Sequence, residues 1–164
     1  MIVIKKVLIF CFVIIPSLLK ATDNRLFHID RSKNSNIVCY DVNITDNKID
    51  KAKPLNVYWA NSEDVGHRKE LTFIQNKLAY GYKTVSKNES YIEISLNAFP
   101  DKIIRIEQYN DMFRPTTSIN NHIALLKKIY VKADTANSLK VEYIEITGEI
   151  IESGEIVSEK IYIK

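Results

Sequence analysis

The residues of this chain whose types could do chemistry together are His28 and Cys39, which lie in two apolar stretches on either side of Lys33 and Asn34. A two-residue turn at Lys33 and Asn34 would join the stretches as an antiparallel hairpin and set His28 opposite Cys39. Directly opposed side chains have Cβ atoms about 4.5 to 5.5 Å apart. An imidazole oriented by Asp41, or by a nearby aspartate, could then take the proton of the thiol and leave a nucleophile.

The position of Cys39 also supports a purely structural role. Cys39 lies mid-strand between Val38 and Tyr40, where burial is expected, and burial in apolar surroundings raises the pKa of a thiol and suppresses its reactivity. No neighbouring pattern supplies a second group to stabilise an oxyanion. We therefore expect Cys39 to be a slow-reacting core residue, and we keep a small extracytoplasmic hydrolase or thiol enzyme using His28, Cys39 and Asp41 as the alternative.

Other catalytic patterns are absent from the sequence. It contains no Gly-rich phosphate loop, GxSxG elbow or HExxH pair, and only 4 glycines. His28, His67 and His122 are far apart and lack nearby companions in a metal-ligand pattern, so we predict no metal and no cofactor. Acidic residues are plentiful, but the separation of any carboxylate pair cannot be derived from the sequence.

Aromatic and polar residues suggest recognition instead of catalysis. Arg31, Lys33 and Asn34 occupy the predicted first turn, and Tyr58 and Trp59 follow in a short predicted strand. Tyr and Trp combine an apolar face with a hydrogen-bonding tip, which suits a glycan, a lipid or a peptide, although such residues also fill cores. We take these residues as the candidate recognition surface of a non-enzymatic binding or envelope-associated protein, whose partner could be a glycan, a lipid or an envelope protein.

The first residues are typical of a secretory signal peptide. "MIVIKK" is basic, "VLIFCFVIIPSLL" is apolar and "LKA" ends in a small residue, which predicts cleavage after Ala21. The apolar run is shorter than the roughly 20 residues of a membrane-spanning helix, so we expect no stable transmembrane span after cleavage. The prediction is residues 1–21 as signal peptide, and 22–164 as a single β-rich domain that is periplasmic or secreted.

Removal of this segment changes the charge and the cysteine content. The chain has 23 Lys and Arg against 20 Asp and Glu, and the predicted signal peptide contains Lys5, Lys6 and Lys20 but no acidic residue. The mature chain is therefore formally neutral, and no clustered basic stripe favours a nucleic-acid or an anionic-membrane partner. Cys39 remains as its only cysteine, so an internal disulfide is excluded.

Alternating apolar and polar residues predict the strands that must position these groups. Val141–Ile151 and Ile156–Ile163 form a predicted hairpin, in which a turn at Ser153 and Gly154 sets Ile146 against Ile161. Two further hairpins are predicted to turn at Phe99–Asp101 and at Asn120 and Asn121, since asparagine tolerates positive φ.

Helical spacing occurs once. Leu71, Ile74 and Leu78 recur on one side of a helix predicted from about Arg68 to Tyr80, with Gly81 just past its end. The predicted fold is mainly β, an antiparallel meander of about eight strands closed as a barrel or folded as a sandwich, with one α-helix packed against it.

Several blocks also carry a resemblance. In order, they are "FHIDRSKNSNIVCYDVN", "VYWA", "ELTFIQNKLAYGYK", "LKKIYVK" and "LKVEYIEITG" with "SGEIVSEKI". Over Leu26 to Lys160 the chain resembles a family of small secreted proteins from Bacteroidota catalogued as a domain of unknown function, DUF4833. The resemblance implies export and a lineage but no reaction. In that lineage, "DTA" at Asp134 to Ala136 is similar to an O-glycan acceptor site, which would make Thr135 the modified residue.

Overall fold

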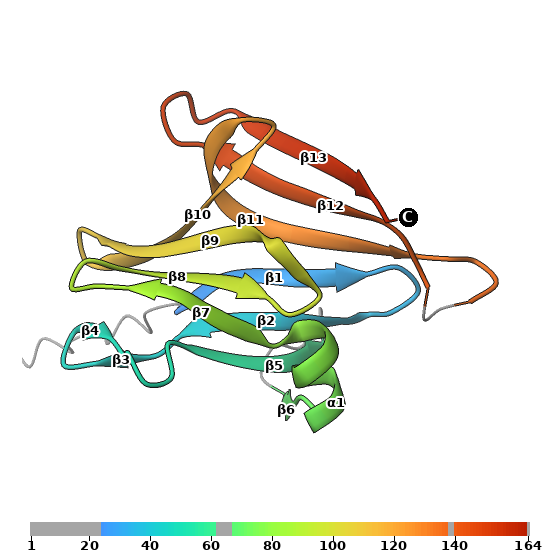
Figure 1. Cartoon of the computed structure of the whole chain (residues 1–164), viewed down its shortest axis with the longest axis horizontal. Helices are drawn as coiled ribbons and strands as arrows, with labels where there is room; N and C mark the ends of the chain where they lie inside the picture. The colour runs from blue at the N-terminus through green and yellow to red at the C-terminus, as the bar shows by residue number, and fades with distance from the viewer. Residues whose placement is uncertain (1–23, 62–66, 138–139, 164) are drawn as a thin grey trace, which may run out of the picture.

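Strands form most of the chain in the computed structural model, which describes residues 24–61, 67–137 and 140–163 (Figure 1). The predicted signal peptide, residues 1–21, lies outside the described residues. Among the helices of the described part, none is both long enough and apolar enough to cross a membrane.

One curled sheet holds 11 strands, and two short strands pair separately. In chain order the strands are β1 (Arg25–Arg31), β2 (Asn36–Val42), β3 (Ile44–Thr45), β4 (Lys48–Ile49), β5 (Leu55–Asn61), β6 (Arg68–Glu70), β7 (Tyr82–Lys87), β8 (Tyr91–Leu96), β9 (Phe99–Tyr109), β10 (Met112–Ile119), β11 (His122–Ala133), β12 (Val141–Ile150) and β13 (Ile156–Tyr162). The main path of the sheet runs β6-β5-β2-β1-β11-β10-β9-β8-β7, and β12 and β13 extend it from β11.

The long strand β11 organises the sheet. Its first residues pair with β10, as in Thr116 opposite Leu125, and its later residues pair with β1, as in Ile29 opposite Ile129. Strand β12 pairs along most of the length of β11. The sheet therefore curls into a half-barrel, with β7, β8 and β9 in one wing and β1, β2 and β5 in the other (Figure 1).

The predicted mainly β fold with one short helix is confirmed, but the pairing of β1 with β11 is parallel. A purely antiparallel meander is therefore wrong at this one junction. Strand β1 fills the part of the β11 edge that β10 leaves open. Alternation within a strand shows which face is buried, but it does not show which distant strand lies alongside.

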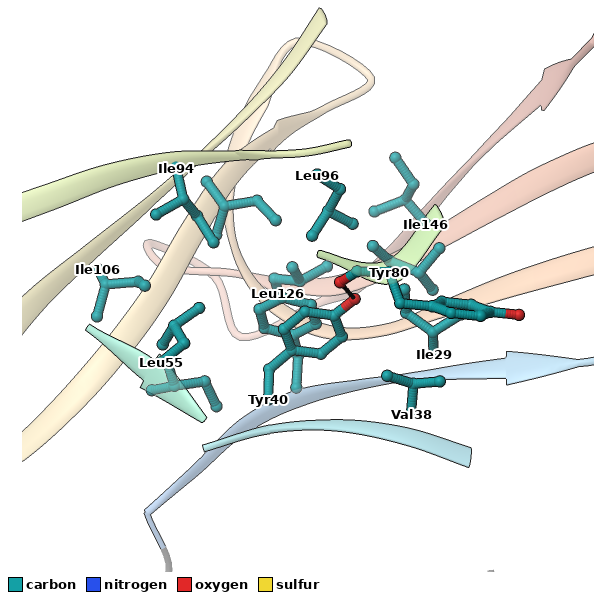
Figure 2. Close-up of a cluster of buried hydrophobic side chains, with 14 of the residues drawn as sticks. Ile29, Val38, Tyr40, Leu55, Tyr80, Ile94, Leu96, Ile106, Leu126 and Ile146 are labelled. Carbon is teal, nitrogen blue, oxygen red and sulfur yellow. Dashed lines mark hydrogen bonds between the residues drawn. The ribbon is translucent and has the colours of Figure 1, made fainter. Parts of the chain in front are cut away.

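The core lies between the two wings of the half-barrel. Figure 2 shows Val38, Tyr40 and Leu55 from one wing packed with Ile94 and Ile106 from the other. Tyr40 is fully buried and stacks on Phe27 with ring centroids 4.4 Å apart. Its hydroxyl donates to the Tyr80 carbonyl oxygen at 2.6 Å, which satisfies the buried polar group.

The first hairpin has the predicted register. His28 lies opposite Cys39, with Phe27 opposite Tyr40 on the other face. A bulge at the start of β1 shifts the pairing there, so Asp41 lies opposite Arg25 and not opposite Leu26 as the two-residue turn predicts. The turn at Asn120 and Asn121 is also confirmed, with φ angles of 48° and 66°.

The last hairpin differs from the prediction by two residues, because Ile146 lies opposite Glu159 and not opposite Ile161. The loop is longer than two residues: the Gly154 N–H donates to the Ile150 carbonyl at 2.8 Å, and Gly154 has a φ of 72°. A shift of two residues keeps each side chain on its predicted face.

Two further boundaries were predicted wrongly. The turn between β8 and β9 is at Asn97 and Ala98, and the irregular pairing before Ile103 accommodates Pro100 inside β9. The predicted helix starts too early, because Arg68–Glu70 pairs with the edge of β5 as strand β6.

The helix itself consists of α1 (Phe73–Gln75) continued by a π-helical turn, η1 (Asn76–Tyr80). A capping box starts it: the Gln75 N–H donates to Thr72 Oγ1 at 3.3 Å and the Thr72 N–H donates to Gln75 Oε1 at 3.0 Å. At the other end, a Cβ on Gly81 would lie 2.1 Å from the Asn76 carbonyl oxygen, so this close approach requires glycine.

Candidate functional site

Tyr58 and Trp59 lie on opposite faces of strand β5. Trp59 pairs opposite the core residue Val38 and packs against the main core, whereas Tyr58 pairs opposite Cys39 in a separate small cluster. The candidate recognition surface predicted from the sequence is therefore divided between two faces of the sheet.

Trp59 lines a pocket of about 370 Å³ beside the start of the helix. The first turn contributes Asn34, and the rest come from strands β2, β5 and β6, from the residue before β6 and from the helix with its N-cap. The lining residues are Asn34, Asn36, Trp59, Ala60, Asn61, His67, Lys69, Thr72 and Gln75. We call this cavity the Trp59 pocket.

The helix start fixes the indole in this pocket. Trp59 Nε1 lies 3.3 Å from Gln75 Oε1 and donates to it. The same oxygen accepts the Thr72 N–H of the capping box, so helix capping and indole positioning depend on one amide. The Trp59 ring also meets Tyr80 edge-on at 5.2 Å. These contacts come from segments that sequence reasoning assigned only to a core-packing helix.

The two cations of the candidate surface bind to different segments of the chain. Arg31 Nη1 donates to the Tyr80 hydroxyl at 3.3 Å, next to the aromatic pair that Tyr80 forms with Trp59. Lys33 Nζ instead donates to the carbonyl oxygen of Thr135 at 3.1 Å. Thr135 is exposed in the loop between β11 and β12.

Tyr58 belongs to a charged cluster on the other face. Its hydroxyl donates to Asp41 Oδ2 at 2.6 Å, and Arg25 Nε donates to Asp41 Oδ1 at 2.7 Å. Burial lowers the pKa of Arg25, but its hydrogen bonds to Asp41 and Tyr58 outweigh this effect and the pKa is raised. Burial and the hydrogen bond to Asp41 raise the pKa of Tyr58. The cluster is thus a satisfied ion pair with a neutral phenol.

Arg68 completes this cluster from strand β6. Its guanidinium lies 4.5 Å from the centroid of the Tyr58 ring, and its Nη2 is 3.5 Å from Asp41 Oδ2. The contact joins the edge strand to the ion pair of Arg25 and Asp41.

The alternative catalytic residues are only partly brought together. His28 lies opposite Cys39, but Asp41 is bound to Arg25 and Tyr58, and the carboxylate near His28 Nε2 is that of Asp30 at 3.4 Å. Burial raises the pKa of the Cys39 thiol, and Cys39 has no exposed surface. Burial also lowers the pKa of His28. These shifts favour a neutral thiol beside a neutral imidazole, which is the opposite of an activated pair.

The three histidines are far apart in the fold. His28 is in β1, His67 precedes β6 and His122 begins β11. Across residues 24–61, 67–137 and 140–163, no group of three or more His, Cys, Asp or Glu side chains is placed to hold a metal ion.

A larger groove of about 930 Å³ lies over β9, β10 and β13, and the sequence reasoning missed it. Four of its charged side chains form two ion pairs: Lys102 Nζ lies 2.8 Å from Glu159 Oε2, and an Arg105 nitrogen lies 2.7 Å from Glu93 Oε1. The lining residues are Glu93, Phe99, Asp101, Lys102, Ile103, Arg105, Glu107, Thr116, Thr117, Ser118, Ile123, Glu159 and Ile161. The charged residues of β9 are visible in the sequence, but they do not predict a groove. The groove forms because β13 lies near them in the fold.

The fold and its cavities define a mainly β half-barrel protein with a tryptophan-lined pocket at the helix start. The family model described as "Domain of unknown function (DUF4833)" matches residues 27–160, and the chain belongs to this family. The resemblance inferred from the sequence blocks is thereby confirmed. No curated protein and no solved structure gives a significant match to the chain.

Proposed function

We propose that this protein is an exported, non-enzymatic binding protein that holds a glycan in the Trp59 pocket. The observation that carries the proposal is the arrangement of one indole among four side-chain amides, those of Asn34, Asn36, Asn61 and Gln75. Export is supported by the signal-peptide pattern of residues 1–21, and a periplasmic or secreted location follows from that pattern.

The chemistry of the lining suits sugars. A sugar ring presents an apolar face of C–H groups that packs on an aromatic ring, and its hydroxyl groups both donate and accept hydrogen bonds. Amide side chains also both donate and accept. The Thr72 hydroxyl adds a further donor and acceptor at the pocket wall. A volume of about 370 Å³ lies at the lower end of the usual range for small-molecule sites.

The larger groove is a weaker candidate for the glycan site than the Trp59 pocket. Its lysine, its arginine and two of its carboxylates already bind one another at 2.7 to 2.8 Å, so a ligand would have to compete with those ion pairs. The four amides of the Trp59 pocket carry no charge, and the lysine of its lining, Lys69, is exposed, so a polar neutral ligand faces a smaller desolvation penalty there.

Calorimetric titration with a panel of neutral and N-acetylated oligosaccharides tests the proposal. The protein used is the chain from Thr22, which retains every described strand and every residue of the main core. We expect at least one oligosaccharide to bind, and Trp59→Ala to abolish binding. Asn36→Ala should weaken binding roughly threefold to tenfold, the effect of one hydrogen bond.

The matched control is Gln108→Ala, which removes an exposed amide at the far end of β9. We expect its affinity to equal that of the unsubstituted protein. Absence of binding across the panel, or equal binding by Trp59→Ala, would show that the pocket is not a glycan site. Release of a cleaved product would show that the protein is an enzyme.

A further inference from the structure

The outward side of the helix is apolar and exposed. Phe73 is 77% exposed, and Ile74 and Leu78 are each 67% exposed. We call these three residues the helix face. Sequence periodicity predicts that Ile74 and Leu78 pack inward, yet the residues that do so are Gln75, Ala79 and Tyr80.

The helix is held firmly by that inner side. Gln75 binds the Trp59 indole, and the Tyr80 carbonyl accepts the hydroxyl of the buried Tyr40 at 2.6 Å. The Asn97 amide donates to the Asn76 carbonyl at 2.8 Å and fixes the π-helical turn. Because the inner contacts are satisfied, the helix face cannot turn into the core without breaking them. The helix itself lies at one corner of the molecule (Figure 1).

The chain segment that carries the helix face is basic. The segment 68–83 contains four basic residues and one acidic residue, whereas the predicted mature chain is formally neutral. Arg68 is engaged with Asp41, but Lys69, Lys77 and Lys83 are exposed. Lys77 Nζ lies 5.7 Å from the centroid of the Phe73 ring, so cation and apolar anchor occupy the same surface.

We propose that the helix face docks on the surface of an anionic lipid bilayer. Exposed Phe, Ile and Leu side chains on a short projecting helix can enter the interfacial region of a bilayer without a complementary groove. Lysines beside them are attracted to anionic headgroups. Exposed apolar side chains in a segment with surplus positive charge fit an anionic bilayer better than a neutral protein surface. This inference is independent of the glycan proposal.

Co-sedimentation with lipid vesicles tests the inference, using the chain from Thr22 so that the predicted signal peptide does not bind lipid itself. Vesicles of phosphatidylcholine with phosphatidylglycerol are compared with vesicles of phosphatidylcholine alone. We expect binding to the anionic vesicles, weakened by added salt because salt screens exposed charges. Phe73→Ser combined with Leu78→Ser should lower partitioning about tenfold or more, as two apolar side chains are lost.

The matched control replaces two exposed apolar residues elsewhere, Ile156→Ser with Tyr162→Ser, which are 64% and 70% exposed on β13. It should bind the vesicles like the unsubstituted protein. Lys77→Glu should reduce both the binding and its salt dependence. Thermal melts confirm that each variant is folded. Absence of binding to anionic vesicles, or equal loss in the β13 control, would overturn the inference.

Discussion

Trp59 Nε1 lies 3.3 Å from Gln75 Oε1, so the residue that caps the helix also holds the indole of the pocket. The hydrogen bond joins strand β5 to the helix across 16 positions of the chain. It places the chain's single tryptophan where its fluorescence reports on the pocket.

Replacing Gln75 with alanine tests this relationship. The substitution removes the acceptor of the indole and half of the capping box, and we expect it to cost about 0.5 to 2 kcal/mol of unfolding free energy. Trp59 should also become more accessible to acrylamide. Urea unfolding and fluorescence quenching measure the two effects. Gln108→Ala should change neither, and unchanged quenching in Gln75→Ala would show that the hydrogen bond does not position the indole.

Asp41 should stabilise the fold through Arg25. Asp41→Asn leaves the Arg25 guanidinium without its anionic partner, which we expect to cost about 1 to 3 kcal/mol, less than a fully buried pair because both groups retain some solvent contact. Denaturant titration measures the change. The exposed pair of Lys51 and Glu89 is the control, since Glu89→Gln should leave stability unchanged. Equal effects at both sites would contradict the assignment.

His28 should make stability depend on pH. Burial lowers its pKa below the ordinary 6.5, opposed by Asp30 and assisted by Lys128 and Arg25. The unfolded chain therefore takes up a proton before the folded protein does, and stability is lost as pH falls through 6.5 toward the folded pKa. Above that window, His28 is neutral in both the folded and the unfolded state, so its contribution to stability is constant.

Unfolding free energies measured at neutral and at mildly acidic pH check this prediction. The unsubstituted protein should lose more stability on acidification than His28→Gln, which cannot titrate. If His28→Gln loses as much stability on acidification as the unsubstituted protein, groups other than His28 cause the pH dependence.

Cys39 should react slowly in the folded protein. Iodoacetamide should alkylate the native thiol more slowly than the urea-unfolded thiol, because burial raises its pKa. Cys39→Ser should cost about 1 to 3 kcal/mol through a poorly satisfied buried hydroxyl. Faster reaction of the native thiol, abolished by His28→Ala, would instead support the thiol-enzyme alternative.

Local patterns predicted what local interactions determine. The pairing of His28 with Cys39 and the turn at Asn120 and Asn121 follow from alternation and from tolerance of positive φ, and both are confirmed. The register of the last hairpin depends on more distant residues. Glu159 lies opposite Ile146, and in this register its carboxylate pairs with Lys102 of β9 and accepts the Asn120 backbone N–H. No feature within the hairpin signals those partners.

The candidate site shows the same limit. Successive side chains of a strand point to opposite faces, so Tyr58 and Trp59 of β5 face opposite ways. The prediction of a single surface containing both residues did not take this alternation into account. The amides around Trp59 come from three parts of the chain, namely the first hairpin, the end of β5 and the helix, and their convergence depends on the fold as a whole. The exposed Ile74 and Leu78 could not be recognised, because helical spacing identifies an apolar side of a helix but not what covers it.

The ¹⁵N–¹H spectrum of the folded protein tests the central claim most directly. Trp59 is the only tryptophan, so the spectrum contains one indole N–H resonance. During titration with the oligosaccharide that binds, this resonance and the side-chain amides of Asn34, Asn36 and Gln75 should move together and saturate. If the indole resonance stays fixed while backbone resonances around Lys102 and Glu159 move, the ligand occupies the larger groove and the Trp59 pocket is not the binding site.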